Sequence, residues 1–184
     1  MNSQTINIHA GLIERCRNGD QVAQYEIYQL YSKAMYNTAL RICAVQEEAE
    51  DVLQEAFLSA FRNIASYRED STFGAWLKRI VINKAITSLR RSEKEALMME
   101  EVEDVEKYDD GFESVSGLTV ERVKAAVLEL PKGFRSVVSL YLFEGYDHKE
   151  ISDILGITES TSKSQFKRGK DKLRQLLEKE VKYG

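Results

Sequence analysis

The sequence predicts an all-α protein made of two small helical domains joined by an acidic flexible linker, with a helix-turn-helix in the second domain. Its 184 residues include one proline and ten glycines, so long stretches are free to form helices. Apolar residues recur there every three or four positions, which is the period of a helix with one buried face. Acidic residues are concentrated in one segment. We therefore expect domains at residues 1–91 and 118–184 and a linker at residues 92–117.

Three long helices are expected in the first domain. Asp20 can cap the first, whose apolar stripe comprises Val22, Ala23, Ile27, Leu30, Tyr31, Ala34, Met35 and Ile42. The second opens with four acids, which suit a helix N-terminus, and its stripe comprises Ala49, Val52, Leu53, Ala56, Phe57, Ala60, Phe61 and Ile64. A polar connection at residues 66–71 precedes the third, at about residues 72–91.

Two shorter helices open the second domain. The first carries Val120, Val123, Val127 and Leu130 and is closed by Pro131. The next carries Phe134, Val137, Val138, Tyr141 and Leu142 and precedes Gly145. A basic tail with Leu173, Leu176 and Leu177 completes the domain.

Residues 146–170 have the pattern of a helix-turn-helix. Asp147 and Glu150 have the spacing of a capping box, Gly156 suits a helix C-terminus, and Thr158 can cap a second helix. That second helix combines cations, which hold phosphates, with short polar side chains that let a helix approach base edges. They are Ser160, Thr161, Lys163, Ser164, Gln165, Lys167, Arg168 and Lys170. A helical hairpin with a basic, solvated face is the alternative, and the Gly-Ile-Thr turn favours DNA binding.

Charge is segregated along the chain. The segment 92–117 contains ten acids and two bases and carries a net charge of −8, so the remainder carries +4 of the overall −4. Two DNA-facing domains joined by an acidic tether would show this distribution. The simpler interpretation of the acidic run is a solvated linker that self-repulsion keeps extended.

The helix expected near residues 76–91 is basic and contains no acid. Its cations are Lys78, Arg79, Lys84, Arg90 and Arg91, and the aromatic residues Tyr67, Phe73 and Trp76 lie in or beside the preceding loop. Cations next to aromatic rings suit single-stranded or opened nucleic acid. Alternatively, Phe73 and Trp76 belong to the core, because their spacing with Leu77 and Ile80 is that of a core stripe.

Other site classes have little support in the sequence. Cys16 and Cys43 are unclustered and fall in helical patterns, so buried free thiols are expected rather than a disulfide or a metal site. His9 and His148 also stand alone. We expect no cofactor, metal, catalytic residue or small-molecule substrate. The sequence has no membrane-spanning stretch and no signal peptide, so we expect a cytoplasmic protein without direct membrane insertion.

Three motifs in order resemble the extracytoplasmic-function (ECF) sigma factors of bacterial RNA polymerase. They are AEDVLQEAFLSAF at residues 49–61, the pattern WL-RI--N-----LRR at residues 76–91, and LPKGFRSVVSLYLFEGYDHKEISDILGITESTSKS at residues 130–164. The resemblance covers almost the whole chain. It implies a sigma factor that binds core RNA polymerase, directs it to specific promoters and assists DNA melting, without being an enzyme.

The resemblance also implies site residues. Those expected to bind the polymerase clamp helices are Asp51, Gln54 and Phe57, and those expected at the −10 element are Tyr67, Arg68, Asp70, Phe73, Arg79 and Asn83. Those expected at the −35 element are Ser160, Thr161, Lys163, Ser164, Lys167 and Arg168. Earlier helices of the second domain would hold the polymerase flap, and the linker would thread toward the RNA exit path. An anti-sigma factor and a role in stress or envelope signalling are implied as well.

Four residues depart from the family pattern. Thr87 stands where an aspartate is common, and Gln165 stands where an arginine is frequent. Ser162 and Gly169 replace the usual valine and alanine on the inner side of the recognition helix, where a glycine costs about 1 kcal/mol relative to alanine. The resemblance therefore does not define the −35 sequence that this chain prefers.

Two other functional classes are alternatives for this sequence. One is a stand-alone helix-turn-helix transcriptional regulator whose N-terminal half senses a ligand or dimerises, and the other is a helical adaptor without a DNA role. The basic helix beside the loop at residues 66–71 argues against both, because a protein that binds only duplex DNA does not need a base-capturing loop.

Overall fold

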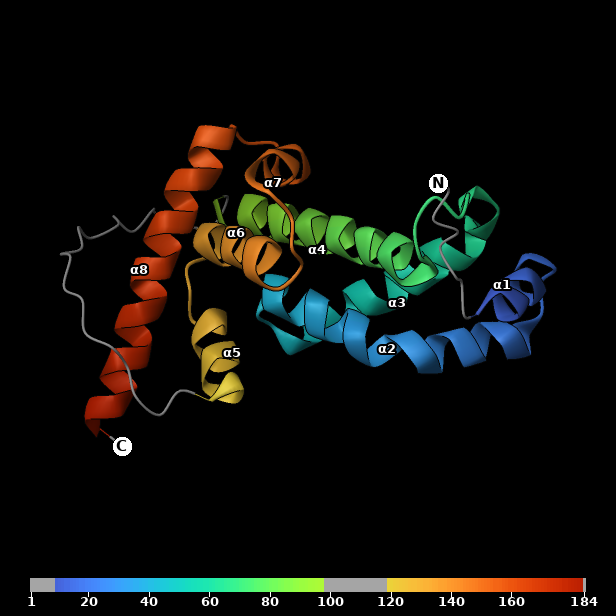
Figure 1. Ribbon diagram of the computed structural model, residues 1–184, viewed down its shortest axis with the longest axis horizontal. Helices are drawn as coiled ribbons and strands as arrows, with labels where there is room; N and C mark the ends of the chain where they lie inside the picture. The colour runs from blue at the N-terminus through green and yellow to red at the C-terminus, as the bar shows by residue number, and fades with distance from the viewer. Residues whose placement is uncertain (1–8, 98–118, 184) are drawn as a thin grey trace, which may run out of the picture. The chain divides into compact units, whose positions relative to one another are not determined.

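The computed structural model describes residues 9–97 and 119–183, and in them the only regular elements are helices, which confirms the predicted all-α class (Figure 1). The chain divides into two compact units between Arg91 and Ser92. The first contains α1 (Ala10–Arg17), α2 (Gln21–Cys43), α3 (Gln46–Arg62), the 3₁₀ turn η1 (Ile64–Ser66) and most of α4 (Phe73–Leu97). The second contains α5 (Val120–Leu128), α6 (Lys132–Leu142), α7 (His148–Leu155) and α8 (Glu159–Tyr183).

The start of the expected linker is helical. Residues 92–97 continue α4 beyond the predicted end of that helix, and residues 98–117 lie outside the described part of the chain. None of the described helices is long and apolar enough to span a membrane.

Helix α1 contains Cys16, which the sequence analysis placed in a helical pattern without predicting the bounds of a helix there. It buries Ile13 and Cys16 and ends before Gly19, whose φ of 80° lies in the left-handed region. Cys16 and Cys43 are buried thiols that are not joined in a disulfide, as expected, and burial raises the pKa of Cys16. Eight residues are too few to give a clear periodic signal, which explains why the bounds were not predicted.

Asp20 joins α1 to α2. Its carboxylate accepts hydrogen bonds from the backbone N–H groups of Val22 and Ala23, so it is the N-cap that the sequence predicted. Arg15 of α1 donates from Nε to the same carboxylate at 2.7 Å. The Arg15 hydrogen bond, followed by the backbone N–H of Ala23, holds the pKa of Asp20 below its ordinary value.

The stripe predicted for α2 is partly wrong. Ala23 and Ile27 are fully buried, but Val22 is 62% exposed, Leu30 is 52% exposed, and Ala34 is also exposed. The buried face shifts around the helix, from Ala23 and Ile27 near its start to Met35, Thr38, Ala39 and Ile42 further on. A single straight stripe cannot describe a helix whose packing partners change along its length.

Helix α3 follows its predicted stripe closely, and α4 completes the core of the first unit. Ala49, Val52 and Ala56 are buried on α3, and only Phe61 of the stripe is half-buried within the helix. On α4 the buried residues recur with the helical period; they are Phe73, Leu77, Val81, Ile82, Ala85, Ile86 and Leu89. One face of α4 is therefore committed to packing, and the opposite face is left in solvent.

In the second unit, α5, α6 and the C-terminal half of α8 share one core. It contains Ala126, Val127, Leu130, Val138, Leu173 and Leu177. Arg135 is buried in α6 and donates from Nη1 to the carbonyl of Leu130 at 2.8 Å, which satisfies an acceptor beyond the end of α5. Val120 and Leu142, predicted in apolar stripes, are 63% and 49% exposed because they lie at the outer ends of short helices.

The helix-turn-helix has the predicted local chemistry. Asp147 accepts from the N–H of Glu150 at 2.8 Å and Glu150 accepts from the N–H of Asp147 at 2.9 Å, forming a capping box at the start of α7. Gly156 ends α7 with a φ of 66°, and Thr158 Oγ1 accepts from the N–H of Thr161. The predicted recognition helix and the basic tail form one continuous helix, α8, so the C-terminal leucines lie on the same helix as the residues predicted to face DNA.

At Gly169, α8 packs closely against α6. A Cβ at this position would lie 2.6 Å from Cγ2 of Val138 and 3.2 Å from Cβ of Phe134. Val138 is fully buried, so a shift of its side chain would disturb the core. The glycine that looked like a weakness of the recognition helix therefore permits the close packing of α6 and α8.

We predict that Gly169→Ala destabilises the second unit although alanine is the better helix former. Overpacking costs about 1–3 kcal/mol, which exceeds the roughly 1 kcal/mol gained in helix propensity. Circular dichroism should show an earlier thermal transition that fluorescence of the single tryptophan, Trp76 in the first unit, does not follow. Gly11→Ala in α1 is the control, because its Cβ would meet nothing within 4 Å. Equal or greater stability of Gly169→Ala would contradict the packing.

We also predict a pH-dependent effect of Asp20→Asn. Asparagine caps a helix about as well as aspartate, so the substitution isolates the charge that Arg15 contacts. Because the pKa of Asp20 is lower in the folded state, its charge stabilises the fold above the unfolded-state pKa of about 3.9, and this contribution is lost as pH falls through the folded-state pKa. The variant should melt earlier than the wild type at pH 7, and the difference between their melting temperatures should shrink as the pH is lowered below about 3.9. A difference that stays constant across the acid range would show that the charge is not responsible.

Candidate nucleic-acid and polymerase interfaces

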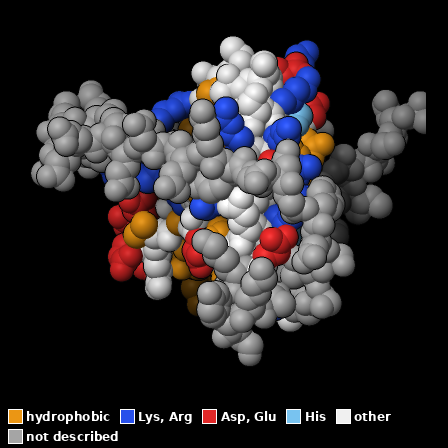
Figure 2. Space-filling view, turned by 90° about the vertical axis from the view of Figure 1, so that its left-hand side faces the viewer, with side chains coloured by type: hydrophobic (Ala, Val, Ile, Leu, Met, Phe, Trp, Pro, Cys, Tyr) orange, Lys and Arg blue, Asp and Glu red, His pale blue; other side chains and the backbone are white. Residues whose placement is uncertain are grey.

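The residues predicted to contact the −35 element lie together on the outer face of α8. Ser160, Lys163, Ser164, Lys167 and Arg168 are exposed and Thr161 is half-buried. At 3.6 residues per turn all of them fall on one half of the helix surface. Figure 2, which looks onto the side of the picture where α8 lies, shows Lys and Arg side chains over the upper part of that face. The arrangement gives cations that flank short hydroxyl side chains.

Two of these side chains already have partners within α8. Nζ of Lys163 lies 2.6 Å from Oε1 of Glu159, and this hydrogen bond lowers the pKa of Glu159. The hydroxyl of Ser164 donates to the carbonyl of Ser160 at 3.0 Å. Glu159 partly neutralises Lys163, so the acid at the start of α8 would compete with a phosphate for this cation.

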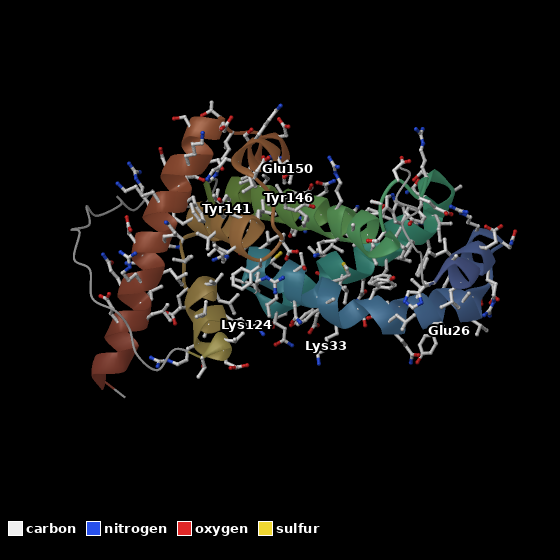
Figure 3. The ribbon with its side chains drawn as sticks, viewed as in Figure 1. Glu26, Lys33, Lys124, Tyr141, Tyr146 and Glu150 are labelled. Atoms are coloured by element: carbon white, nitrogen blue, oxygen red, sulfur yellow. The ribbon has the colours of Figure 1, made fainter. Side chains whose placement is uncertain are left out.

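The inner face of α8 packs against α7 and α6 through a small polar and aromatic cluster. Ser162 is fully buried, and its hydroxyl lies 2.9 Å from Nδ1 of His148 at the start of α7. His148 stacks on Tyr141 of α6, labelled in Figure 3, with ring centroids 4.8 Å apart. Phe166 of α8 lies against Tyr141, 4.3 Å between centroids. Ser162 therefore forms a hydrogen bond with His148, which a valine at this position could not form.

The other two α8 residues that depart from the family pattern, Gln165 and Gly169, lie on the side of the helix that faces α6. Gln165 is half-buried and its amide lies beside Gly133, where a Cβ on Gly133 would meet Nε2 at 3.6 Å. Gly169 lies against Val138 and Phe134 of α6, as described above. Ser162, Gln165 and Gly169 therefore lie on the face of α8 that packs against α6 and α7. The residues predicted to face DNA lie on the opposite side of the helix.

In the first unit, Arg79 and Asn83 lie one turn apart on the exposed face of α4. Thr87, which follows one turn later, donates its hydroxyl to the carbonyl of Asn83 at 2.8 Å and is also exposed. Arg90 and Arg91 continue the exposed face toward the C-terminal end of the helix. These residues form a basic and polar stripe opposite the buried face of α4.

The loop before α4 has an aromatic base and a charged tip. Tyr67 and Phe73 are 3% and 1% exposed, and their centroids lie 5.4 Å apart. Trp76, half-buried, lies 5.4 Å from each ring. Burial, followed by the nearby charge of Glu69, raises the pKa of Tyr67. Arg68 and Asp70 are exposed, so of the residues predicted for the −10 element in this loop only these two reach solvent.

The α3 residues predicted to bind polymerase also include both exposed and buried side chains. Asp51 and Gln54 are exposed, whereas Phe57 is 3% exposed and packs edge-on against Tyr28 of α2 at 4.8 Å. Leu58, which the sequence analysis did not single out, is 55% exposed. It follows Asp51 and Gln54 on the same ridge, at i+7 and i+4. The sequence places Leu58 outside the apolar stripe of α3, but a single exposed apolar residue is ordinary on a protein surface and so gave no distinct signal.

A groove between α3 and α4 brings two predicted sites together. Asp51 from the polymerase-binding set and Asn83 from the −10 set both line it. Lys84 of α4 lies 3.5 Å from Glu55 of α3 across this groove. The groove is lined by Glu48, Asp51, Val52, Glu55, Ser59, Ile80, Asn83, Lys84, Thr87, Ser88 and Arg91.

Comparisons with known proteins identify both units. Residues 27–95 match the model of Sigma-70 region 2, and residues 121–173 match that of Sigma-70 region 4. The chain is 31% identical over 176 residues to the ECF RNA polymerase sigma factor SigW of Bacillus subtilis, covering 90% of this chain and 94% of that protein. It is 32% identical over 159 residues to SigM of Mycobacterium tuberculosis, covering 86% and 79%.

Solved structures show the same fold. The sigma factor RpoE of Bartonella quintana, solved with the anti-sigma factor NepR, aligns with a TM-score of 0.56 at 22% identity and covers 84% of this chain and 96% of its own. CnrH, solved with the cytosolic domain of CnrY, aligns with a TM-score of 0.53 at 23% identity and covers 91% and 95%.

The matches to both Sigma-70 regions define a sigma factor of RNA polymerase, a class of transcription initiation factors rather than of enzymes. This chain belongs to the ECF RNA polymerase sigma factors. As an alternative sigma factor it binds core RNA polymerase and promoter DNA and directs the polymerase to specific promoters.

We predict that Glu159→Gln strengthens binding to duplex DNA. The substitution releases Lys163 and removes a negative charge from the DNA-facing end of α8. Affinity for a non-specific duplex should rise several-fold in low salt, and the slope of log K against log salt should steepen by about 1, as expected for one more phosphate contact. Asp171→Asn is the matched control, because Asp171 also lies near an arginine but about 18 Å further along α8. Unchanged binding by Glu159→Gln would mean that Lys163 does not contact phosphate.

Proposed function

We propose that the exposed face of α8 recognises the −35 element as duplex DNA. The residues that carry this contact are Ser160, Thr161, Lys163, Ser164, Lys167 and Arg168. The supporting observation is the division of α8 into two faces, because these residues lie opposite the buried Ser162 and Gly169. Cations on the flanks would hold phosphates and fix the register, and the short hydroxyl side chains between them would let the helix approach base edges.

The −10 element is assigned to the first unit. Arg79 and Asn83 on α4 and Arg68 and Asp70 in the preceding loop are exposed and can contact DNA. Tyr67 and Phe73 are buried, so their contribution is to support the loop from beneath rather than to touch a base from the surface. A base taken out of its stack costs a few kcal/mol, which a preformed loop over an aromatic base can offset by binding.

Core polymerase is assigned to the ridge of α3. Asp51 and Gln54 supply polar contacts and Leu58 an exposed apolar one, while Phe57 holds the helix in place from the core. The earlier helices of the second unit would hold the polymerase flap. The acidic segment 92–117 would link two domains, residues 1–91 and 118–184, and its charge suits a basic channel built for RNA.

Two further parts of the proposal concern the cellular setting. The protein would act in the cytoplasm, where bacterial polymerase and DNA are found. An anti-sigma factor would control it, and the support is that two similar folds were solved with partners, RpoE with the anti-sigma factor NepR and CnrH with the cytosolic domain of CnrY.

Run-off transcription tests the proposal. Core polymerase with this protein should transcribe a subset of a randomised promoter library, and core polymerase alone should not. The recovered templates should share two short elements, one for each unit. If the folded protein binds core polymerase but no template is enriched, promoter selection by this chain is excluded. Enrichment of a single duplex element without any transcript would instead indicate a stand-alone helix-turn-helix regulator.

We predict that Arg168→Ala weakens binding to the selected −35 duplex about tenfold while binding to core polymerase stays unchanged. Removing one phosphate or base contact of this kind costs about 1–3 kcal/mol. Lys124→Ala makes the same change of net charge on α5, which packs with the C-terminal half of α8 rather than with its predicted DNA-facing half, and should leave duplex binding unchanged (Figure 3). A parallel loss of core binding by Arg168→Ala would show that this face of α8 has been misassigned.

A further inference from the structure

Arg17 at the end of α1 is joined to the loop between η1 and α4, 50 residues further along the chain. Its Nη2 donates to the carbonyl of Tyr67 at 2.8 Å and lies 3.4 Å from Oε1 of Glu69. Its Nη1 lies 3.2 Å from Oε2 of Glu14 on its own helix, which orients the guanidinium. The guanidinium carbon also lies 6.0 Å from the centre of the Tyr67 ring. The Arg17 side chain thus contacts the start of the loop at three points, which are the backbone carbonyl of Tyr67, the ring of Tyr67 and the carboxylate of Glu69.

The loop is held from a second direction by its own tyrosine. The hydroxyl of Tyr67 donates to the carbonyl of Ser71 at 2.7 Å, so the buried ring ties the end of the loop to its beginning. Thr72 then accepts from the N–H of Ala75 and caps the first turn of α4. Only residues 68–70 are left to project between these fixed points, and all three are exposed.

Glu69 is the middle residue of the exposed segment 68–70, and its backbone conformation is unfavourable. Its φ is 63°, in the left-handed region that residues other than glycine rarely adopt. Such a conformation persists when neighbouring contacts favour it, and the ion pair with Arg17 is a contact that does so. Arg68 and Asp70 flank Glu69, so the direction in which they project depends on the same backbone turn.

We propose that Arg17 is a positioning residue for promoter opening, which holds the loop at residues 67–72 in the shape that receives −10 DNA. The inference rests on the proposed function and adds to it a residue from outside the match to Sigma-70 region 2, which begins at residue 27. Arg17 touches no DNA in this account. It acts by keeping the loop ordered before DNA arrives, so that less ordering is required on binding.

Arg17→Met in the full-length protein tests the inference, with Arg15→Met as the matched control. Arg15 lies on the same helix and pairs with Asp20 and Glu26, away from the loop. Hydrogen exchange without DNA should show amides 67–72 exchanging at least about tenfold faster in Arg17→Met only. Holoenzyme with Arg17→Met should bind the single-stranded −10 oligonucleotide recovered from the promoter library about tenfold more weakly, with core and −35 duplex binding within twofold of wild type.

A second variant keeps the test valid if Arg17→Met folds poorly. Glu69→Gln changes a side chain that is 53% exposed and removes only the carboxylate that Arg17 contacts. In hydrogen exchange without DNA it should speed the amides 67–72 less than Arg17→Met does, because the hydrogen bond from Arg17 to the Tyr67 carbonyl remains. Unchanged loop exchange in Arg17→Met, or equal effects of the Arg17 and Arg15 variants, would overturn the inference. Failure of the wild type to select any promoter would instead contradict the proposed function, and the exchange experiment would still decide whether Arg17 orders the loop.

Discussion

In each unit one helix, α4 or α8, contributes both to the hydrophobic core and to the proposed ligand surface. The residues that such a helix can expose to a ligand are therefore limited by those that it must bury. A helix that packs on one side presents the other at a fixed angle, so the core determines where the exposed residues lie. On α8, Gly169 allows close approach to α6, and Ser162 contacts His148 of α7. On α4, Leu77 and Val81 are fully buried and set the direction in which Arg79 and Asn83 face.

The same constraint explains how binding could open DNA without a catalytic group. The first unit offers a loop that aromatic packing supports from beneath and that Arg17 and the Tyr67 hydroxyl hold from two sides. Order of this kind is established during folding, so it need not be created when DNA binds. The free energy of binding can then be applied to unstacking a base, which requires only a few kcal/mol. Polymerase binding by the neighbouring helix α3 would bring that loop to the promoter.

Local chemistry made much of the fold predictable. The Asp20 cap, the capping box of α7, the positive φ of Gly156 and the stripe of α3 all follow from residue type and spacing, which short-range contacts decide. Tertiary contacts decided what was missed. The buried face of α2 shifts as its partners change, which left Val22 and Leu30 exposed, and α1 was too short for its bounds to be predicted. The three departures in α8 could be interpreted only once α6 and α7 were in place.

For the candidate sites, the sequence indicated the helices but could not separate surface from core. Phe57, Tyr67 and Phe73 are buried members of the predicted sets, and Leu58 and Arg17 are the residues that the structure adds. Fluorescence of 2-aminopurine placed in the −10 element of a selected promoter tests the central claim most directly. Holoenzyme formed with this protein should raise the fluorescence without any nucleotide, because binding alone unstacks the base. Fluorescence that stays at the duplex level until nucleoside triphosphates are added would contradict the account.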